Sequence, residues 1–218
     1  MPYLETGTNT TIYIYYGNPE ATSTSNMTNV FGTGLISFWD FDNNVIDVWG
    51  QNNGTIQSGV DLYNVSSRNE TNLSKYFRGN SLEQPSGDIT NLTVGSNTID
   101  LTGQPLVFIS SINYVPNPSN TEGRHVFTTL QNNGYGIYLA PKTGSVDEPL
   151  TLGKVGVNEK QSGVDIISNS WQNVAVKYNS NYATFYTNGT QRANLSYNVT
   201  FNAGNTYGIG SIRKDSAF

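Results

Sequence analysis

Two turns with tyrosines in or beside them carry the residue types that proteins use to bind sugars. Residues 133–138 read NGYGIY, and Tyr178 and Tyr182 flank the turn at residues 179–181, which reads NSN. An exposed aromatic ring can stack on the face of a pyranose, while neighbouring amides bind its hydroxyls. Because tyrosine occurs 14 times in the chain, the same side chains could instead be structural. The residues predicted to contact a ligand are Tyr135, Tyr138, Tyr178, Tyr182 and Asn181.

The single histidine limits the catalytic chemistry that the chain could perform. His125 lies in the segment HVFTTL, a predicted strand, where an isolated histidine is usually packed or hydrogen-bonded. With no second histidine and no cysteine, a zinc site would need carboxylates as its other ligands. No Gly-x-Ser-x-Gly motif follows a strand and precedes a helix, so a Ser–His–Asp triad is not predicted.

The composition excludes several classes of partner. Hydrophobic residues make up 36% of the chain and charged residues only 12%, and the net charge is −5. Instead, 29 asparagines, 24 threonines and 21 serines supply the polar surface. There is no cluster of Lys and Arg, so we expect no nucleic-acid binding. No apolar run is long enough to predict a membrane-spanning helix.

N-glycosylation sequons are frequent. About nine Asn-X-Ser/Thr triplets would arise by chance at this composition, so their number is no proof of modification. We nevertheless expect some of them to carry glycans. The candidate acceptors are Asn9, Asn26, Asn53, Asn64, Asn69, Asn72, Asn91, Asn188, Asn194 and Asn198.

Short β-strands account for nearly every periodic segment. They are rich in β-branched and aromatic residues and are separated by Gly, Asn and Pro, and no helix longer than two turns is predicted. The dipeptide Asn188-Gly189 predicts a two-residue hairpin turn. We therefore expect an all-β protein, either a sandwich or a barrel. The predicted strands are 12–16, 35–41, 106–114, 125–130, 136–140, 174–178, 183–187, 191–195 and 206–212.

Two resemblances divide the chain. Residues 1–31, with the motif IYIYYGNP, resemble the C-terminal end of a small β-domain family of unknown function that is frequent in archaeal and bacterial surface proteins. Residues 33–218, with GLISFWDFDNNVIDVWGQNNGTI and SWQNVAVKYNSNYATFYTNGTQ, resemble laminin-G-like, concanavalin A-like jelly rolls. The resemblances imply a last strand of a preceding domain at 1–21, a linker at 22–34, and a two-sheet antiparallel jelly roll at 35–218 whose C-terminal strand is cut off.

The jelly-roll resemblance also implies roles for particular residues. Trp39, Trp49 and Trp171 match positions that fill the core or its edges, and Gly189 matches the central hairpin. Modules of this kind often hold one Ca²⁺ at the rim of the sandwich. The loop residues Asp88, Asp100 and Asp147 could be its ligands, or they could be solvated turn residues.

Enzymes also occur among jelly rolls of this kind, so glycoside hydrolysis is an alternative to binding. Hydrolysis with retention of the anomeric configuration requires two carboxylates about 5–5.5 Å apart. Asp40 and Asp42 could share one face of a strand, but no Glu-x-Asp-x-x-Glu pattern is present and the glutamates are isolated. We therefore expect that the protein is not an enzyme.

Together these features predict an extracellular adhesion or recognition module. It would bind a glycan or cell-surface glycoprotein as part of a surface protein, virion spike or tail fibre of an archaeon or its virus. A structural spacer or assembly module is the main alternative, and a carbohydrate-active enzyme is the third. The expected partners also include the other domains of the parent chain, and further copies of the chain are an open alternative.

Overall fold

The computed structural model divides the chain into two compact units, residues 1–34 and 35–218. The described residues are 20, 29, 34–41, 44–50, 52–56, 60–66, 73–77, 92–94, 105–114, 124–129, 134–140, 148–154, 157–201 and 207–210. Side chains are described for all of these except 56, 60–66, 73–77, 92–94, 124 and 129. The strand expected at 12–16 therefore lies outside the described residues, and the elements below all belong to the second unit.

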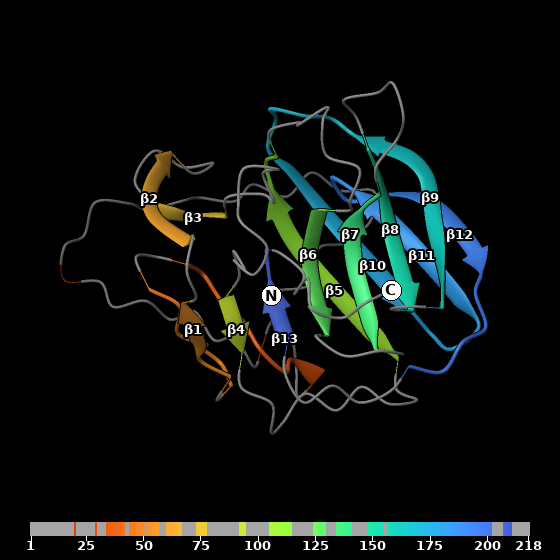
Figure 1. The fold of residues 1–218 in the computed structure, drawn as a ribbon, viewed down its shortest axis with the longest axis horizontal. Coiled ribbons are helices and arrows are strands. Elements are labelled where there is room, and N and C mark those ends of the chain that lie inside the picture. Colours follow the sequence, from red (N-terminus) through yellow and green to blue (C-terminus); the bar gives the residue numbers. More distant parts are fainter. Residues whose placement is uncertain are drawn as a thin grey trace, which may run out of the picture. The chain divides into compact units, whose positions relative to one another are not determined.

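The described strands form an antiparallel two-sheet sandwich. One sheet has the order β1-β4-β13-β6-β7-β8-β9 and the other has the order β12-β11-β10-β5, while β2 and β3 pair separately. In Figure 1, β6 to β9 lie in front of β5, β10, β11 and β12. The strands are β1 (Gly54–Ile56), β2 (Val60–Ser66), β3 (Leu73–Phe77), β4 (Leu92–Val94), β5 (Leu106–Ile112), β6 (Arg124–Thr129), β7 (Tyr135–Leu139), β8 (Glu148–Lys154), β9 (Asn158–Ile166), β10 (Gln172–Tyr178), β11 (Tyr182–Thr187), β12 (Thr190–Ser196) and β13 (Tyr207–Ile209).

The core lies between the two sheets and is rich in aromatic rings. Alternate residues of each strand point inward, as the two-residue period of a strand requires. Phe127 on β6 contacts the rings of Tyr135 and Tyr207 at centroid distances of 5.9 and 5.6 Å. Fully buried aliphatic side chains surround these rings: Ile137, Leu139, Leu150, Leu152, Ile166, Val174 and Val176.

Buried tyrosines fasten neighbouring elements through their hydroxyls. Tyr197 accepts a hydrogen bond from the amide of Lys154 and donates to the carbonyl of Asn158, each at 3.0 Å, which joins it to the β8–β9 hairpin. Tyr114 donates to the carbonyl of Ile166 at 3.0 Å. Because these two hydroxyls have partners, Tyr197 and Tyr114 are buried without the cost of an unpaired polar group.

The predicted hairpin turn between β11 and β12 is confirmed. Thr187 and Thr190 are paired, and the two residues between them have positive φ angles, 48° at Asn188 and 78° at Gly189. Those angles define a type I′ turn, which Asn-Gly adopts readily. The turn is also tied to β10, because the amide of Asn173 donates to Oδ1 of Asn188 at 2.9 Å.

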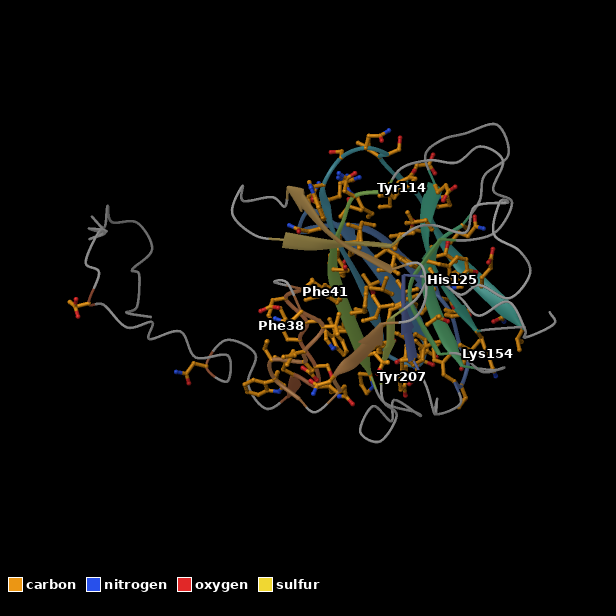
Figure 2. The ribbon with its side chains drawn as sticks, turned by 60° about the vertical axis from the view of Figure 1, so that its left-hand side comes forward. Phe38, Phe41, Tyr114, His125, Lys154 and Tyr207 are labelled. Carbon is orange, nitrogen blue, oxygen red and sulfur yellow. The ribbon has the colours of Figure 1, made fainter. Side chains whose placement is uncertain are left out.

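One strand prediction is wrong. Exposure alternates along residues 35–41, with Phe38 exposed and Phe41 packed against the core (Figure 2). The segment is nevertheless not a strand, because its described backbone bonds go to a loop. The amide of Phe38 donates to Oδ1 of Asp47, and the amide of Val48 donates to the carbonyl of Phe38, both at 2.9 Å. The alternation correctly predicted which side chains of this segment face inward. It did not predict that the segment's backbone bonds go to a loop.

Asp47 organises that loop. Its side chain is 4% exposed and accepts four backbone hydrogen bonds of 2.9–3.1 Å. Burial by itself would raise the pKa of Asp47, but these bonds more than offset it and the pKa lies below the ordinary 3.8. The carboxylate therefore stays ionised and holds the loop against the extended segment. The four donors are the amides of Phe38, Trp49, Gly50 and Asn52.

Candidate functional site

A row of side chains crosses the outer face of the larger sheet. Ile137, Leu150 and Leu152 face the core, so the residues between them on β7 and β8 face outward. The register aligns His125 on β6 with Tyr138 on β7, and Tyr138 with Thr151 on β8. One pair further along the strands, Gly153 on β8 faces Glu159 on β9. We call His125, Tyr138, Gly153, Glu159 and Gln161 the outer-face site.

Tyr138 is the centre of the outer-face site and is held on three sides. Its ring stacks on the imidazole of His125, with centroids 4.8 Å apart and planes at 24°. Below it lies Gly153, where an added Cβ would be only 2.9 Å from Cε1 of Tyr138, so only glycine leaves room for the ring. The hydroxyl donates a hydrogen bond to Oε2 of Glu159. Gln161 completes the arrangement by donating from Nε2 to Oε1 of Glu159 at 2.7 Å.

The protonation states at this site follow from burial and charge. Burial lowers the pKa of His125 to about 4, so the imidazole is neutral at pH 7. Its Nδ1 atom is buried and has no hydrogen-bond partner among the described residues. Burial, the hydrogen bond to Glu159 and the charge of Glu159 all raise the pKa of Tyr138. Tyr138 therefore remains a neutral phenol that donates its proton to the carboxylate.

Solvent reaches part of this row. Glu159 and Gln161 are exposed and Tyr138 is half-buried. Gly153 and Thr151, in contrast, are buried. The accessible groups are therefore a carboxylate, an amide and the partly exposed ring of a fixed tyrosine. This set can stack on an apolar sugar face and accept hydrogen bonds from hydroxyls.

The five predicted ligand-binding residues do not form one site. Tyr135 and Tyr178 are 1% and 3% exposed, so the expectation of exposed rings at these two positions is wrong. The two rings face the core because of strand alternation and both pack against Phe201, at 5.8 and 5.0 Å. Tyr182 and Asn181 are exposed. They belong to the turn and first residue of β11 in the smaller sheet, whereas Tyr138 lies on the outer face of the larger one.

The turn at 179–181 is well ordered by its own side chain. Oδ1 of Asn179 accepts hydrogen bonds from the amides of Asn181 and Tyr182, at 3.2 and 2.8 Å. Ser180 between them has a φ of 73°, which the tight turn requires. These bonds give Asn179 a structural role in the turn.

The predicted calcium ligands Asp88, Asp100 and Asp147 lie outside the described residues, as does Asp42, one carboxylate of the predicted catalytic pair. Asp40 is exposed on the extended segment. In the part of the chain that the structure describes, no three His, Cys, Asp or Glu side chains are grouped so that they could hold a metal ion.

Four sequon asparagines have described side chains, and all four are exposed: Asn53, Asn188, Asn194 and Asn198. Asn194 accepts a hydrogen bond from the Thr184 hydroxyl through Oδ1, at 3.0 Å. This bond does not use the amide nitrogen to which a glycan would be attached. Asn64 lies on β2 with its side chain outside the described residues, and the others lie outside altogether: Asn9, Asn26, Asn69, Asn72 and Asn91.

The tryptophans have structural contacts. Nε1 of Trp39 donates to the carbonyl of Asn52 at 2.9 Å, and Nε1 of Trp49 donates to the carbonyl of Leu35 at 2.7 Å. Trp39 also packs against Phe127, with ring centroids 6.4 Å apart. Trp171, just before β10, is half-buried.

Sequence reasoning missed four members of the outer-face site. Glu159 and Gln161 lie on β9, whose sequence NEKQSGVDI lacks the apolar alternation of a typical strand. His125 was expected to be packed, and it is, but its contact with Tyr138 depends on the register of β6 and β7. A weak signal was present in Gly153, since a glycine inside a strand often marks a close approach by another group.

The first part of the chain matches a family of unknown function. The match covers residues 1–52 and carries the description "Domain of unknown function (DUF2341)". A search of curated proteins found no match to this chain. No helix among the described residues is long and apolar enough to cross a membrane.

Solved structures resemble most of the chain. Domain 4 of AbnA, a GH43 extracellular arabinanase from Geobacillus stearothermophilus, in complex with arabinotriose, gives a TM-score of 0.54 at 15% identity, over 82% of this chain and 84% of that one. The receptor binding domain of botulinum neurotoxin D gives 0.53 at 17% identity, over 81% of this chain and 44% of that one. These similarities show the fold: the chain is an all-β, two-sheet antiparallel jelly roll, as predicted.

Proposed function

We propose that residues 35–218 form an extracellular recognition module that binds a glycan at the outer-face site. The observation that carries this proposal is the fixed ring of Tyr138, which is stacked on His125, seated on Gly153 and bonded to Glu159. A half-buried aromatic ring beside an exposed carboxylate and amide suits a sugar. Because the ring is already held in place, binding loses little side-chain entropy.

The structural neighbours support binding rather than catalysis. One of them is a domain of an arabinanase that was captured with arabinotriose, and the other is a receptor binding domain. From these neighbours we infer that the parent protein acts outside the cell, as a surface protein, virion spike or tail fibre. Calcium held by Asp88, Asp100 and Asp147, and glycans on the sequons, belong to the same proposal.

A structural spacer or assembly module is the second candidate, and a different observation favours it. Val107 and Ile109 on β5 are 60% and 66% exposed on the outer face of the smaller sheet. Apolar side chains in such positions suit contact with another domain of a parent protein. A module of this kind would need no ligand at the outer-face site.

Glycan binding by the folded chain tests the proposal. We expect specific binding on an array of neutral, amino and acidic oligosaccharides, with at least tenfold weaker binding after Tyr138→Ala. Tyr182→Ala is the matched control, because it removes an exposed tyrosine from the other sheet and should leave binding unchanged. Far-UV circular dichroism verifies that both variants fold.

Three outcomes would change the assignment. If the folded chain binds no glycan, the spacer role replaces recognition. Loss of binding in Tyr182→Ala but not in Tyr138→Ala would move the site to the turn at 179–181. Release of new reducing ends from a bound polysaccharide would favour the carbohydrate-active enzyme. A parallel experiment with a calcium chelator tests whether the metal contributes to binding.

A further inference from the structure

We infer that the outer-face site selects neutral or amine-bearing glycans and discriminates against glycans with carboxylate or sulfate groups. This inference rests on the proposed function and specifies its ligand class. It follows from which hydrogen-bonding groups of the site are already used and from the charges on this face of the sheet.

The hydrogen bonds within the site use the only donor of Tyr138 and one of the two donors of Gln161. Tyr138 has a single hydroxyl proton, and that proton is donated to Glu159. Gln161 donates one of its two amide protons to the same carboxylate. A carboxylate offers only acceptors, so Glu159 has lone pairs left but no proton. These three side chains therefore offer a ligand only acceptors and one N–H of Gln161, and the neutral imidazole of His125 adds one further N–H to the site.

The described lysines of β8 and β9 lie on the opposite side of these strands. Lys160 pairs with Leu152, a core-facing residue, and Lys154 is also two positions from Leu152 on the same side of β8. Strand alternation therefore separates both lysines from the outer-face site. Asp165, in contrast, pairs with Pro149, which shares its side of β8 with Gly153, and so adds a second carboxylate to this face of β9.

A ligand complementary to this face must supply donors and no negative charge. Sugar hydroxyls and ammonium groups donate to carboxylates in strong, charge-assisted hydrogen bonds. A ligand carboxylate or sulfate beside Glu159 would instead place like charges together, and neither described lysine of β8 and β9 lies on this face to pair with it, which disfavours binding. The ring of Tyr138 does not distinguish neutral or amino glycans from acidic ones, because it would contact only the apolar face of the sugar.

Matched oligosaccharides test the inference. We would measure affinities by isothermal titration calorimetry for oligomers of a hexose, of the corresponding hexosamine and of the corresponding hexuronic acid. The folded chain should bind the neutral or amino series at least tenfold more tightly than the acidic series. Glu159→Gln removes the charge but keeps an acceptor, so it should reduce this preference at least threefold. Asp40→Asn, which neutralises an exposed carboxylate elsewhere, should leave the preference unchanged.

Three other outcomes would each overturn a different claim. Tighter binding of the acidic series would overturn the inferred ligand class while leaving glycan binding intact. A preference that survives Glu159→Gln unchanged would overturn the role given to this carboxylate. No binding of any series by the folded chain would instead overturn the proposed function itself.

Discussion

Removing the carboxylate of Asp47 should destabilise the protein strongly. Its two oxygens accept four backbone hydrogen bonds of 2.9–3.1 Å, three at Oδ1 and one at Oδ2. In Asp47→Ala all four amides lose their acceptor. In Asp47→Asn the oxygen can keep its three bonds, but the new NH₂ group faces the amide of Asn52.

The magnitude follows from the charged acceptor. Hydrogen bonds to a charged group contribute about 1.5–3 kcal/mol each. The sum over four such bonds overestimates the net loss of stability. The variant no longer buries a carboxylate, and water can reach the half-buried Trp49 and Gly50. We expect Asp47→Ala to lower the free energy of unfolding by about 3–5 kcal/mol and Asp47→Asn by about 1–3 kcal/mol. Asp40→Asn, at an exposed position, should stay within about 0.5 kcal/mol.

Urea unfolding tests this prediction with two probes. Trp39 and Trp49 report on the segment through fluorescence, while circular dichroism reports on the sheets. The pH dependence supplies a second test. Because the folded pKa of Asp47 lies below 3.8, its contribution is present above that pH and is lost as the pH falls through the folded value. A loss below about 1 kcal/mol for Asp47→Ala at pH 7 by both probes would refute the reasoning.

Three further predictions concern the core, the hairpin and the histidine. Ile137→Ala should cost about 2–5 kcal/mol of unfolding free energy, whereas Ile109→Ala, at a 66% exposed position, should cost less than about 1 kcal/mol in the same urea titration. Gly189→Ala should cost about 1 kcal/mol because its φ is 78°, and Thr190→Ala beside it is the control. Because the folded pKa of His125 is about 4, stability should fall by up to about 3 kcal/mol as pH drops from 6.5 to 4, and this slope should be absent in His125→Phe.

Much of the fold could be predicted because its central strands follow simple rules. β10 and β11 are short, rich in β-branched and aromatic residues and alternate in burial, and the Asn188-Gly189 turn between β11 and β12 has a defined geometry. β8 and β9 could not be found in this way. β8 contains Pro149 and Gly153, and almost all of its residues are buried on both faces, so it lacks alternation. Its glycine is explained only by Tyr138 on the neighbouring strand.

The outer-face site was less predictable than the fold because it depends on a β-bulge. Along β6, His125 and Phe127 are two residues apart, so regular alternation would place both on the same face. The structure pairs His125 with Tyr138 and Phe127 with Ile137, so β6 contains one residue more than β7 at this point. The bulge turns His125 outward onto Tyr138 while Phe127 enters the core. Without the bulge, Tyr138 would lose its stacking contact with the ring of His125. No pattern in the sequence HVFTTL indicates the extra residue.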